Sequence, residues 1–352
     1  MSVVHFVVPA GIDDPARPSG GNAYDRRIAG GLAEAGWAVH LHEVHGSWPR
    51  PDASSLGRLA AAVGGIPEGA LVLLDGLLAS PAPEVLRSEA ARLRLVVIVH
   101  MPLGRGTTED ATRERERAVL SAAASVITTS AFARRALLEL YSLPPDRVHV
   151  AEPGVDPAEL ATGTETAGAL LSVAAVIPGK GHDLLLDALS GLAGLPWDCR
   201  CVGSLERDPA FVERLRRRVL DGGMDGRVHF TGPQAAADLA RSYASADVLV
   251  LPSRGETYGM VVAEALAHGL PVVAARVGGV PEALGHGADG ARPGLLLPPE
   301  DPAALGGALR SWLEDAGLRR RLRAAARERR ASLTDWSTTS SAVADALQGA
   351  TR

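Results

Sequence analysis

Short apolar runs alternate along the chain with longer segments in which apolar residues recur every three or four positions. The short runs predict strands buried on both faces, and the longer segments predict helices. We expect strands at residues 3–8, 37–41, 71–74, 95–100 and 125–128, then at 169–174, 199–202, 227–231, 248–251, 271–275 and 295–297. We expect helices at residues 24–35, 55–63, 84–92, 109–123 and 131–141, then at 182–192, 210–220, 236–244, 259–267, 302–313 and 318–330. This alternation predicts an α/β fold with parallel sheets.

The pattern breaks between residues 157 and 167, where Pro, Gly, Thr and Glu replace the apolar runs. A chain of 352 residues is long enough for two domains of about 150 residues, each with its own core. We therefore predict a doubly wound domain at 1–156, a linker at 157–167 and a second doubly wound domain at 168–335. Two such domains facing each other would place their strand ends on a common cleft.

Composition excludes several classes of protein. The chain carries 36 Lys and Arg against 41 Asp and Glu, a net charge of −5 that argues against a nucleic-acid binder. Its two cysteines give no disulfide framework, which fits a reducing compartment. The start resembles no signal peptide, and no apolar run approaches the roughly 20 residues of a membrane span. We expect a cytoplasmic protein; peripheral contact with a membrane stays open.

The most informative segment runs from Leu251 to Ala275, where a predicted strand is followed by a turn and a helix that starts near Gly259. Free amide groups at a helix start favour an anion such as a phosphate. Glu256 lies in the turn and Glu264 lies just over one turn into the helix, where their carboxylates could accept hydrogen bonds from sugar hydroxyls. On spacing alone, two solvated carboxylates near a helix start explain the pattern equally well.

The ordered set of motifs, by contrast, is specific. The Glu-x7-Glu segment, the following Gly269–Glu282 and the Gly294–Ala303 stretch resemble retaining glycosyltransferases of family 4, which have the GT-B fold. The resemblance is strong over residues 168–335 and weaker over 1–156. It implies two Rossmann-like domains with a cleft between them, and a C-terminal helix at 336–352 that packs back onto the first domain.

The resemblance also implies roles for individual residues. Glu264 would bind the nucleotide ribose and Glu256 the donor sugar, with Lys180 neutralising the departing diphosphate. His100 would lie near the transferred sugar. The remaining donor-binding residues implied by the family pattern are Thr257, Tyr258, Gly259 and Met260 at the helix start, and Gly20 and Gly21 in the N-terminal glycine loop. Individually, an exposed lysine, a strand-end histidine and a Gly-Gly turn are more often structural.

The chain departs from the family pattern at Ala175, where an arginine that contacts the diphosphate is usual. Part of the leaving-group clamp is therefore missing, or another arginine replaces it. Arg254 and Arg207 are the candidates. This departure puts catalytic strength and donor affinity in question, and leaves the fold unaffected.

Three other clusters are explained without a metal or nucleic-acid site. His40, His42 and His45 flank Glu43, but their spacing is not that of a helical zinc site and no Cys or carboxylate cluster completes it, so we expect an acceptor-facing strand end and no metal there. Cys199 and Cys201 lie on one face of a strand and are expected to be buried thiols. The arginines of 319–330 are interspersed with acids nearby and predict a solvated helix face.

The leading hypothesis is a retaining, metal-independent hexosyltransferase without a cofactor. It would move a sugar from a nucleotide-diphosphate sugar, with a UDP-sugar favoured, to a hydroxyl of a small-molecule or glycan acceptor. The alternatives are a sugar-nucleotide epimerase on the same fold and a sugar-nucleotide-binding protein whose activity has decayed, which Ala175 motivates. A phosphorylase would need a pyridoxal-phosphate lysine, for which no motif is present. A glycosidase would need its two carboxyl groups about 5–9 Å apart across the bond.

Overall fold

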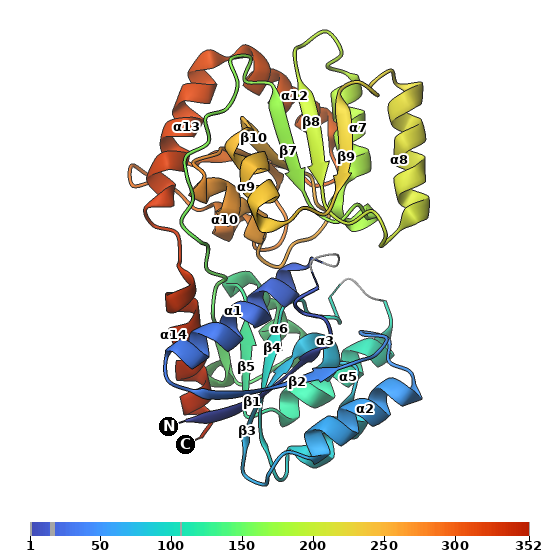
Figure 1. Cartoon of the computed structure of the whole chain (residues 1–352), viewed down its shortest axis with the longest axis vertical. Coiled ribbons are helices and arrows are strands. Elements are labelled where there is room, and N and C mark those ends of the chain that lie inside the picture. Colours follow the sequence, from blue (N-terminus) through green and yellow to red (C-terminus); the bar gives the residue numbers. More distant parts are fainter. Residues whose placement is uncertain (1, 15–17, 106–107, 352) are drawn as a thin grey trace. The chain divides into compact units, whose positions relative to one another are not determined.

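The computed structural model describes residues 2–14, 18–105 and 108–351, and these residues form two α/β units (Figure 1). Contacts between Cα atoms group residues 2–14, 19–154 and 334–351 into an N-terminal unit, and Val155–Leu333 into a C-terminal unit. Each unit contains one six-stranded parallel sheet. Two doubly wound α/β units are therefore present, as the alternation of strands and helices predicts.

The N-terminal sheet has the strand order β2-β1-β3-β4-β5-β6, with every described pair parallel. Its strands are β1 (Val3–Pro9), β2 (Ala38–Val44), β3 (Leu71–Asp75), β4 (Arg94–Val99), β5 (Ser125–Thr128) and β6 (Val148–Val150). Its helices are α1 (Gly20–Glu34), α2 (Ala53–Gly64), α3 (Gly76–Ala79), α4 (Pro83–Glu89), α5 (Asp110–Ala122), α6 (Ala131–Tyr141) and α14 (Trp336–Gly349).

Helices cover both faces of this sheet, so its central strands contribute side chains to two hydrophobic cores. Leu74 of β3 belongs to one cluster and Leu73 to the other. The second cluster also contains Val343 and Leu347 of α14. Because both faces are buried, β3 is apolar at each of its first four positions, which is the pattern that predicts a central parallel strand. The C-terminal helix thus contributes to the N-terminal core.

The C-terminal sheet has the order β12-β11-β10-β7-β8-β9. Its strands are β7 (Ala169–Val173), β8 (Asp198–Val202), β9 (Val228–Gly232), β10 (Val248–Leu251), β11 (Val272–Ala275) and β12 (Gly294–Leu297). Its helices are α7 (His182–Ser190), α8 (Pro209–Asp221), α9 (Ala236–Ala244), α10 (Met260–Ala267), α11 (Val280–Leu284), α12 (Pro302–Glu314) and α13 (Ala316–Arg330). None of the helices in the described part of the chain is long and apolar enough to cross a membrane.

The segment expected as a linker is fastened to the C-terminal unit. Asp247, the residue before β10, is 1% exposed and accepts hydrogen bonds from the Thr164 amide at 3.0 Å and from the Ala169 amide at 2.9 Å. Arg323 of α13 pairs with the same carboxylate at 2.8 Å. A buried carboxylate needs such donors. These bonds hold residues 164–169 in place, a constraint that their loop-like composition does not reveal.

Short elements and one helix start differ from the expectation. The pattern does not predict β6, α3 or α11, which have three to five residues and are too short for a periodic signal. Helix α1 begins at Gly20 and not at Tyr24, because the Ser19 hydroxyl accepts a hydrogen bond from the Asn22 amide at 3.1 Å and caps the helix. Two glycines therefore form the first turn of a helix.

Candidate functional site

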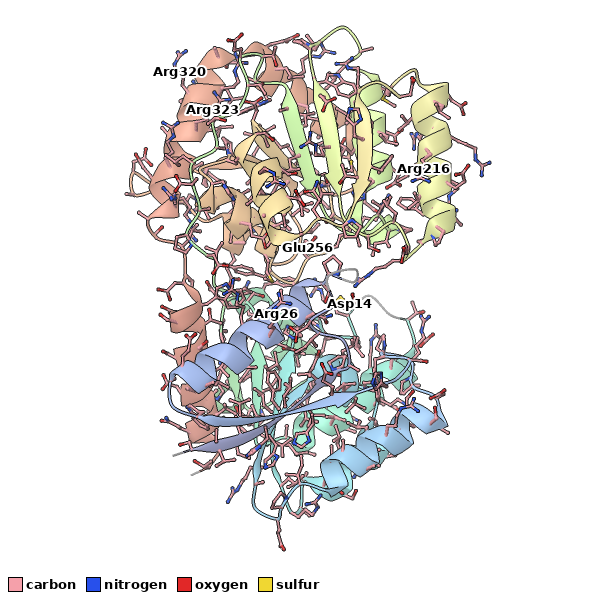
Figure 2. All side chains as sticks on the ribbon, in the orientation of Figure 1. Asp14, Arg26, Arg216, Glu256, Arg320 and Arg323 are labelled. Atoms are coloured by element: carbon pink, nitrogen blue, oxygen red, sulfur yellow. The ribbon has the colours of Figure 1, made fainter. Side chains whose placement is uncertain are left out.

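Two predicted site residues of the C-terminal unit meet at the carboxyl ends of neighbouring strands. Lys180 follows β7 and Glu256 follows β10, and these strands pair in the sheet. The Lys180 Nζ lies 2.6 Å from Glu256 Oε1, and the Ser253 hydroxyl donates to the same oxygen at 2.7 Å. The Lys180 side chain is 28% exposed and that of Glu256 is 12% exposed, so both can be reached by a ligand. Figure 2 shows Glu256 at the end of this unit toward which the strand arrows point.

The Lys180 loop is held close to the end of β10. Gly181 has a φ of +71°, and a Cβ there would lie 2.1 Å from the carbonyl oxygen of Pro252. The Arg254 amide donates to the Gly179 carbonyl at 2.9 Å. Only glycine tolerates both the backbone angle and the close approach at Gly181. The loop therefore presents Lys180 from a fixed position.

Arg254 is one of the two candidates to replace the arginine missing at Ala175, but its side chain forms ion pairs with other residues. Its guanidinium donates to both carboxylate oxygens of Asp183, at 2.9 and 2.8 Å, and to Glu300 at 3.0 Å. Such a fork-to-carboxylate pair is among the stronger polar contacts in proteins. Arg207 is exposed in the loop after β8, and no described residue pairs with its side chain. Of the two, Arg207 is the one with an available charge.

The start of α10 carries the predicted donor-binding backbone. Gly259 has a φ of +99°, and the Gly279 amide donates to the Glu256 carbonyl at 3.1 Å. A Cβ at Gly279 would lie 2.2 Å from the Thr257 carbonyl oxygen, so this second glycine loop packs directly on the turn. Tyr258 is only 5% exposed and belongs to the hydrophobic core, while Met260 is half-buried against it. Tyr258 can reach a ligand through its backbone and hardly through its ring.

Glu264 has a different environment from Glu256. Its Oε2 accepts a hydrogen bond from the Tyr243 hydroxyl at 2.7 Å, and the Tyr243 ring stacks on His268 with centroids 5.1 Å apart. Burial raises the pKa of Glu264, and the Tyr243 hydroxyl opposes that shift. No described residue donates to Oε1. One carboxylate oxygen is thus fixed and the other remains able to accept hydrogen bonds from a ligand.

In the N-terminal unit, the structure brings together Gly21 and His100. The His100 ring follows β4, and a Cβ at Gly21 would lie 3.2 Å from its Cδ2 atom. The Tyr24 ring meets it edge-on, with centroids 5.1 Å apart. Gly20, one residue earlier, is exposed. The lack of a side chain at Gly21 lets the first turn of α1 approach the histidine.

Two acidic residues missed by sequence reasoning surround His100. Asp25 Oδ1 lies 2.8 Å from His100 Nε2, and the ligand-type atoms of Asp25, Asp75 and His100 all lie within 4.8 Å of one another. Asp25 is fully buried and Asp75 is 2% exposed. A signal was available for both: Asp75 closes the buried strand β3 at its carboxyl end, and Asp25 lies one helical turn after Gly21, on the same face.

The pKa values of Asp75 and His100 in this cluster are shifted far from their ordinary values. Burial lowers the pKa of His100, but the charge and hydrogen bond of Asp25, together with the charge of Asp75, outweigh burial and raise the pKa to about 9. Burial, followed by the charge of Asp25, holds the pKa of Asp75 well above its usual range. Among the described residues, this is the one group of three such side chains close enough together to surround a single ion.

Two of the histidines weighed as a metal site join a third histidine in a stack that the sequence does not indicate. His5 of β1 joins His40 and His42, with its Nδ1 2.9 Å from His42 Nε2 and its ring stacked on His40 at 5.0 Å. Burial lowers the pKa values of His5 and His42. His45 has no part in this stack. Cys199 and Cys201 are buried free thiols, as expected.

The chain resembles known proteins in both sequence and structure. Residues 167–315 match the family described as Glycosyl transferases group 1, and residues 77–159 match Glycosyltransferase Family 4. A D-inositol 3-phosphate glycosyltransferase of Jonesia denitrificans is 36% identical over 241 residues, which are 63% of this chain and 55% of the relative. Its counterpart in Kineococcus radiotolerans is 34% identical over 67% of this chain and 59% of the relative. The chain thus spans somewhat over half the length of these relatives.

Solved structures share the whole two-unit fold. HepE of Anabaena, solved with UDP and glucose, has a TM-score of 0.79 at 19% identity and covers 99% of this chain and 100% of its own. The sucrose-phosphate synthase of Thermosynechococcus elongatus has a TM-score of 0.78 at 22% identity, covering 98% of each chain. These likenesses confirm the fold class, a pair of Rossmann-like units of the GT-B type. The family matches over residues 77–159 and 167–315 show that the chain belongs to glycosyltransferase family 4.

Proposed function

We propose that this chain is a retaining glycosyltransferase that moves a sugar from a nucleotide-diphosphate sugar to the hydroxyl of a small molecule. In this reaction the bond between the anomeric carbon and the diphosphate breaks, and a bond to the acceptor oxygen forms on the same face of the sugar. The departing diphosphate accepts the proton of the acceptor hydroxyl. The residues of this chain would bind, orient and stabilise charge, without a required metal ion or cofactor.

The observation that carries the proposal is the pairing of Lys180 with Glu256 at the end of β10 and β7. A diphosphate that departs gains negative charge, and a fixed cation stabilises that charge more in the transition state than in the bound donor. A carboxylate beside the cation suits the hydroxyls of the sugar attached to the phosphate. Cation and carboxylate therefore lie together, as the junction of a sugar and a diphosphate requires.

The nucleotide half of the donor would bind along α10. The helix start, with Gly259 in a left-handed conformation, offers amide groups to the phosphates. Glu264 lies farther along the same helix and has one carboxylate oxygen to which no described residue donates, which suits the ribose hydroxyls. The solved HepE structures contain UDP and UDP-glucose, so a UDP-sugar is the first donor to test.

The acceptor is proposed from the names of the sequence relatives. The relatives that match over about two thirds of this chain are named for D-inositol 3-phosphate. A small polyol or its phosphate is therefore the first acceptor class to examine, with other small alcohols and glycans after it.

The proposal is tested by incubating the chain with a panel of nucleotide sugars in the presence and absence of acceptors. Release of nucleoside diphosphate that depends on acceptor, with the anomeric configuration of the product unchanged by nuclear magnetic resonance, supports the proposal. Release with inversion excludes the retaining reaction. Interconversion of donor sugars without acceptor would show an epimerase.

A second candidate is a sugar-nucleotide-binding protein without transfer activity. It is favoured by Ala175, since Arg254 is bound to Asp183 and Glu300 and does not fill the place of the missing arginine. Saturable binding of a nucleotide sugar with no turnover on any acceptor would support this candidate.

A further inference from the structure

The cluster of Asp25, Asp75 and His100 holds two carboxyl groups and one imidazole out of water. Asp25 Oδ1 is bonded to His100 Nε2, but its second oxygen, Oδ2, is buried and receives no hydrogen bond from any described residue. Asp75 uses Oδ1 to accept a hydrogen bond from the Leu77 amide at 2.7 Å, which caps the short helix α3. A buried carboxylate oxygen without a donor is costly, so something must satisfy Asp25 Oδ2.

The neighbour that can satisfy it is Asp75, because the carboxyl groups of Asp25 and Asp75 offer oxygens within 4.8 Å of each other and lie within hydrogen-bonding reach. Two ionised carboxylates this close repel each other, whereas a protonated carboxyl donates an O–H to its ionised neighbour. The nearby charged or titratable groups are Asp25 and Tyr24 from α1, Asp75 from the end of β3, and His100 after β4. The Tyr24 hydroxyl is occupied, because it donates to the Ala151 carbonyl at 3.0 Å.

We propose that Asp25 is a positioning residue that holds His100 as an imidazolium, while Asp75 keeps a proton and shares it with Asp25 Oδ2. The buried cluster is then neutral overall, with one carboxylate, one carboxylic acid and one imidazolium. This removes the cost of an unbalanced buried charge. The raised pKa values of His100 and Asp75 agree with this distribution.

The protonation state decides what His100 can do. Its Nε2 faces Asp25, and no described residue is bonded to its Nδ1. The side chain is 18% exposed, so the Nδ1–H can reach a ligand. An imidazolium is a cationic donor and cannot remove a proton. His100 therefore binds an electron-rich oxygen, either a sugar hydroxyl or a phosphate, and is excluded as a general base at neutral pH.

This inference rests on the proposed function for its meaning, but the protonation state can be measured without donor or acceptor. The full chain is labelled with ¹⁵N in its histidine rings, and the His100 signals are assigned from their loss in His100→Gln. We expect shifts of a doubly protonated ring at pH 7.5 in the wild type. A neutral His100 at that pH would overturn the proposal even if the chain transfers sugar. A charged His100 at that pH would support the proposal even if the chain transfers no sugar.

Two substitutions separate the roles of the carboxyl groups. Asp25→Asn should lower the pKa of His100 to or below the ordinary value of roughly 6.5, because burial then acts on the ring without the Asp25 carboxylate that opposes it. Asp75→Asn should leave His100 charged, because the amide N–H can donate to Asp25 Oδ2 in place of the shared proton. Asp110→Asn, at a position whose side chain is 89% exposed, is the matched control and should change nothing. Amide spectra of each variant verify folding.

Other outcomes would contradict the shared proton. If Asp75→Asn lowers the pKa of His100 as much as Asp25→Asn does, Asp75 is ionised and the assignment is wrong. If elemental analysis of the purified chain finds one equivalent of a divalent metal and a chelator moves the His100 signals, the three side chains surround a metal ion and not a proton.

Discussion

Lys180 Nζ and Glu256 Oε1 lie 2.6 Å apart, so the cation proposed for the diphosphate and the carboxylate proposed for the sugar neutralise each other. A nucleoside diphosphate must therefore compete with Glu256 for Lys180. Because Ser253 also donates to Glu256 Oε1, the carboxylate keeps one partner when Lys180 turns away. The two proposed roles are coupled through a single oxygen atom.

Glu256→Gln should separate these roles. Without the carboxylate, Lys180 is free for phosphate oxygens, and the affinity for nucleoside diphosphate should rise by up to about tenfold, or ~1.4 kcal/mol. Sugar transfer should fall by at least about tenfold, because charged hydrogen bonds to the sugar are lost. Calorimetry and initial rates measure the two effects, with the exposed Glu213→Gln as control. A loss of diphosphate affinity in Glu256→Gln would contradict the competition.

Lys180→Ala should act mainly on the chemical step. Loss of one charge-stabilising donor lowers kcat by roughly 10²–10³, with a smaller change in the donor KM. Ala175→Arg should recover part of the lost rate if its guanidinium reaches the diphosphate. Arg207→Ala shows whether Arg207 substitutes for the missing arginine: a loss comparable to that of Lys180→Ala assigns it to the clamp. Unchanged transfer in Lys180→Ala would place the clamp elsewhere.

Glu264→Ala should weaken nucleoside diphosphate binding by about 1.5–3 kcal/mol, the value of hydrogen bonds to a charged group. Because burial raises the pKa of Glu264, the carboxylate takes up a proton at a higher pH than an ordinary glutamate. Affinity in the wild type should therefore decline on acidification, and Glu264→Ala should flatten that decline. Calorimetry at several pH values provides the measurement; parallel curves for the two proteins would reject the role of Glu264.

Arg254→Lys should loosen the Lys180 loop. The guanidinium bonds both oxygens of Asp183, and lysine cannot reproduce this planar fork. The pair is slightly less than one third exposed, so we expect a loss of about 1–2 kcal/mol in unfolding free energy. Turnover should also fall, because Lys180 is held less firmly, while the nucleotide affinity conferred by Glu264 remains. Arg217→Lys, in an exposed pair with Glu213, is the control and should be neutral.

The sequence pattern predicts the strands and longer helices well, because strands buried on both faces leave continuous apolar runs, as in β3 and β10. It also predicts that Lys180 and Glu256 lie at strand ends. It could not predict that Lys180 and Ser253 bond the same oxygen of Glu256, or that Arg254 forms an ion pair with Asp183. Those contacts depend on side-chain directions in loops, which no periodicity records.

Residues 164–169 and Asp25 also have tertiary contacts that the sequence pattern does not indicate. The composition of the segment indicates a loop, but its bonds to Asp247 are tertiary. Asp25 appears in the sequence as one polar residue in a helix, and its meaning arises only when β3 and β4 bring Asp75 and His100 beside it. Buried polar groups are specified by their partners, and these partners lie far away along the chain.

The Asp25–His100 pair also predicts how stability changes with pH. The pKa of His100 is raised to about 9 in the folded chain from an ordinary 6.5. Its contribution to the free energy of unfolding is therefore complete below pH 6.5 and is lost as the pH rises through 9. The raised pKa of Asp75 acts in the same direction, because the folded chain keeps a proton that the unfolded chain has already released. The unfolding free energy should therefore fall between pH 7 and pH 9.

Asp25→Asn should reduce this slope, because it removes both the attraction that holds the proton on His100 and the repulsion that holds it on Asp75. Urea unfolding at pH 6, 7, 8 and 9, followed by fluorescence, measures the slope in the wild type and in the variant. His229→Gln provides the control, because His229 pairs with Asp198 in the C-terminal unit and both side chains are about half exposed. Equal slopes in the wild type and Asp25→Asn would show that Asp25 does not govern the protons of the cluster.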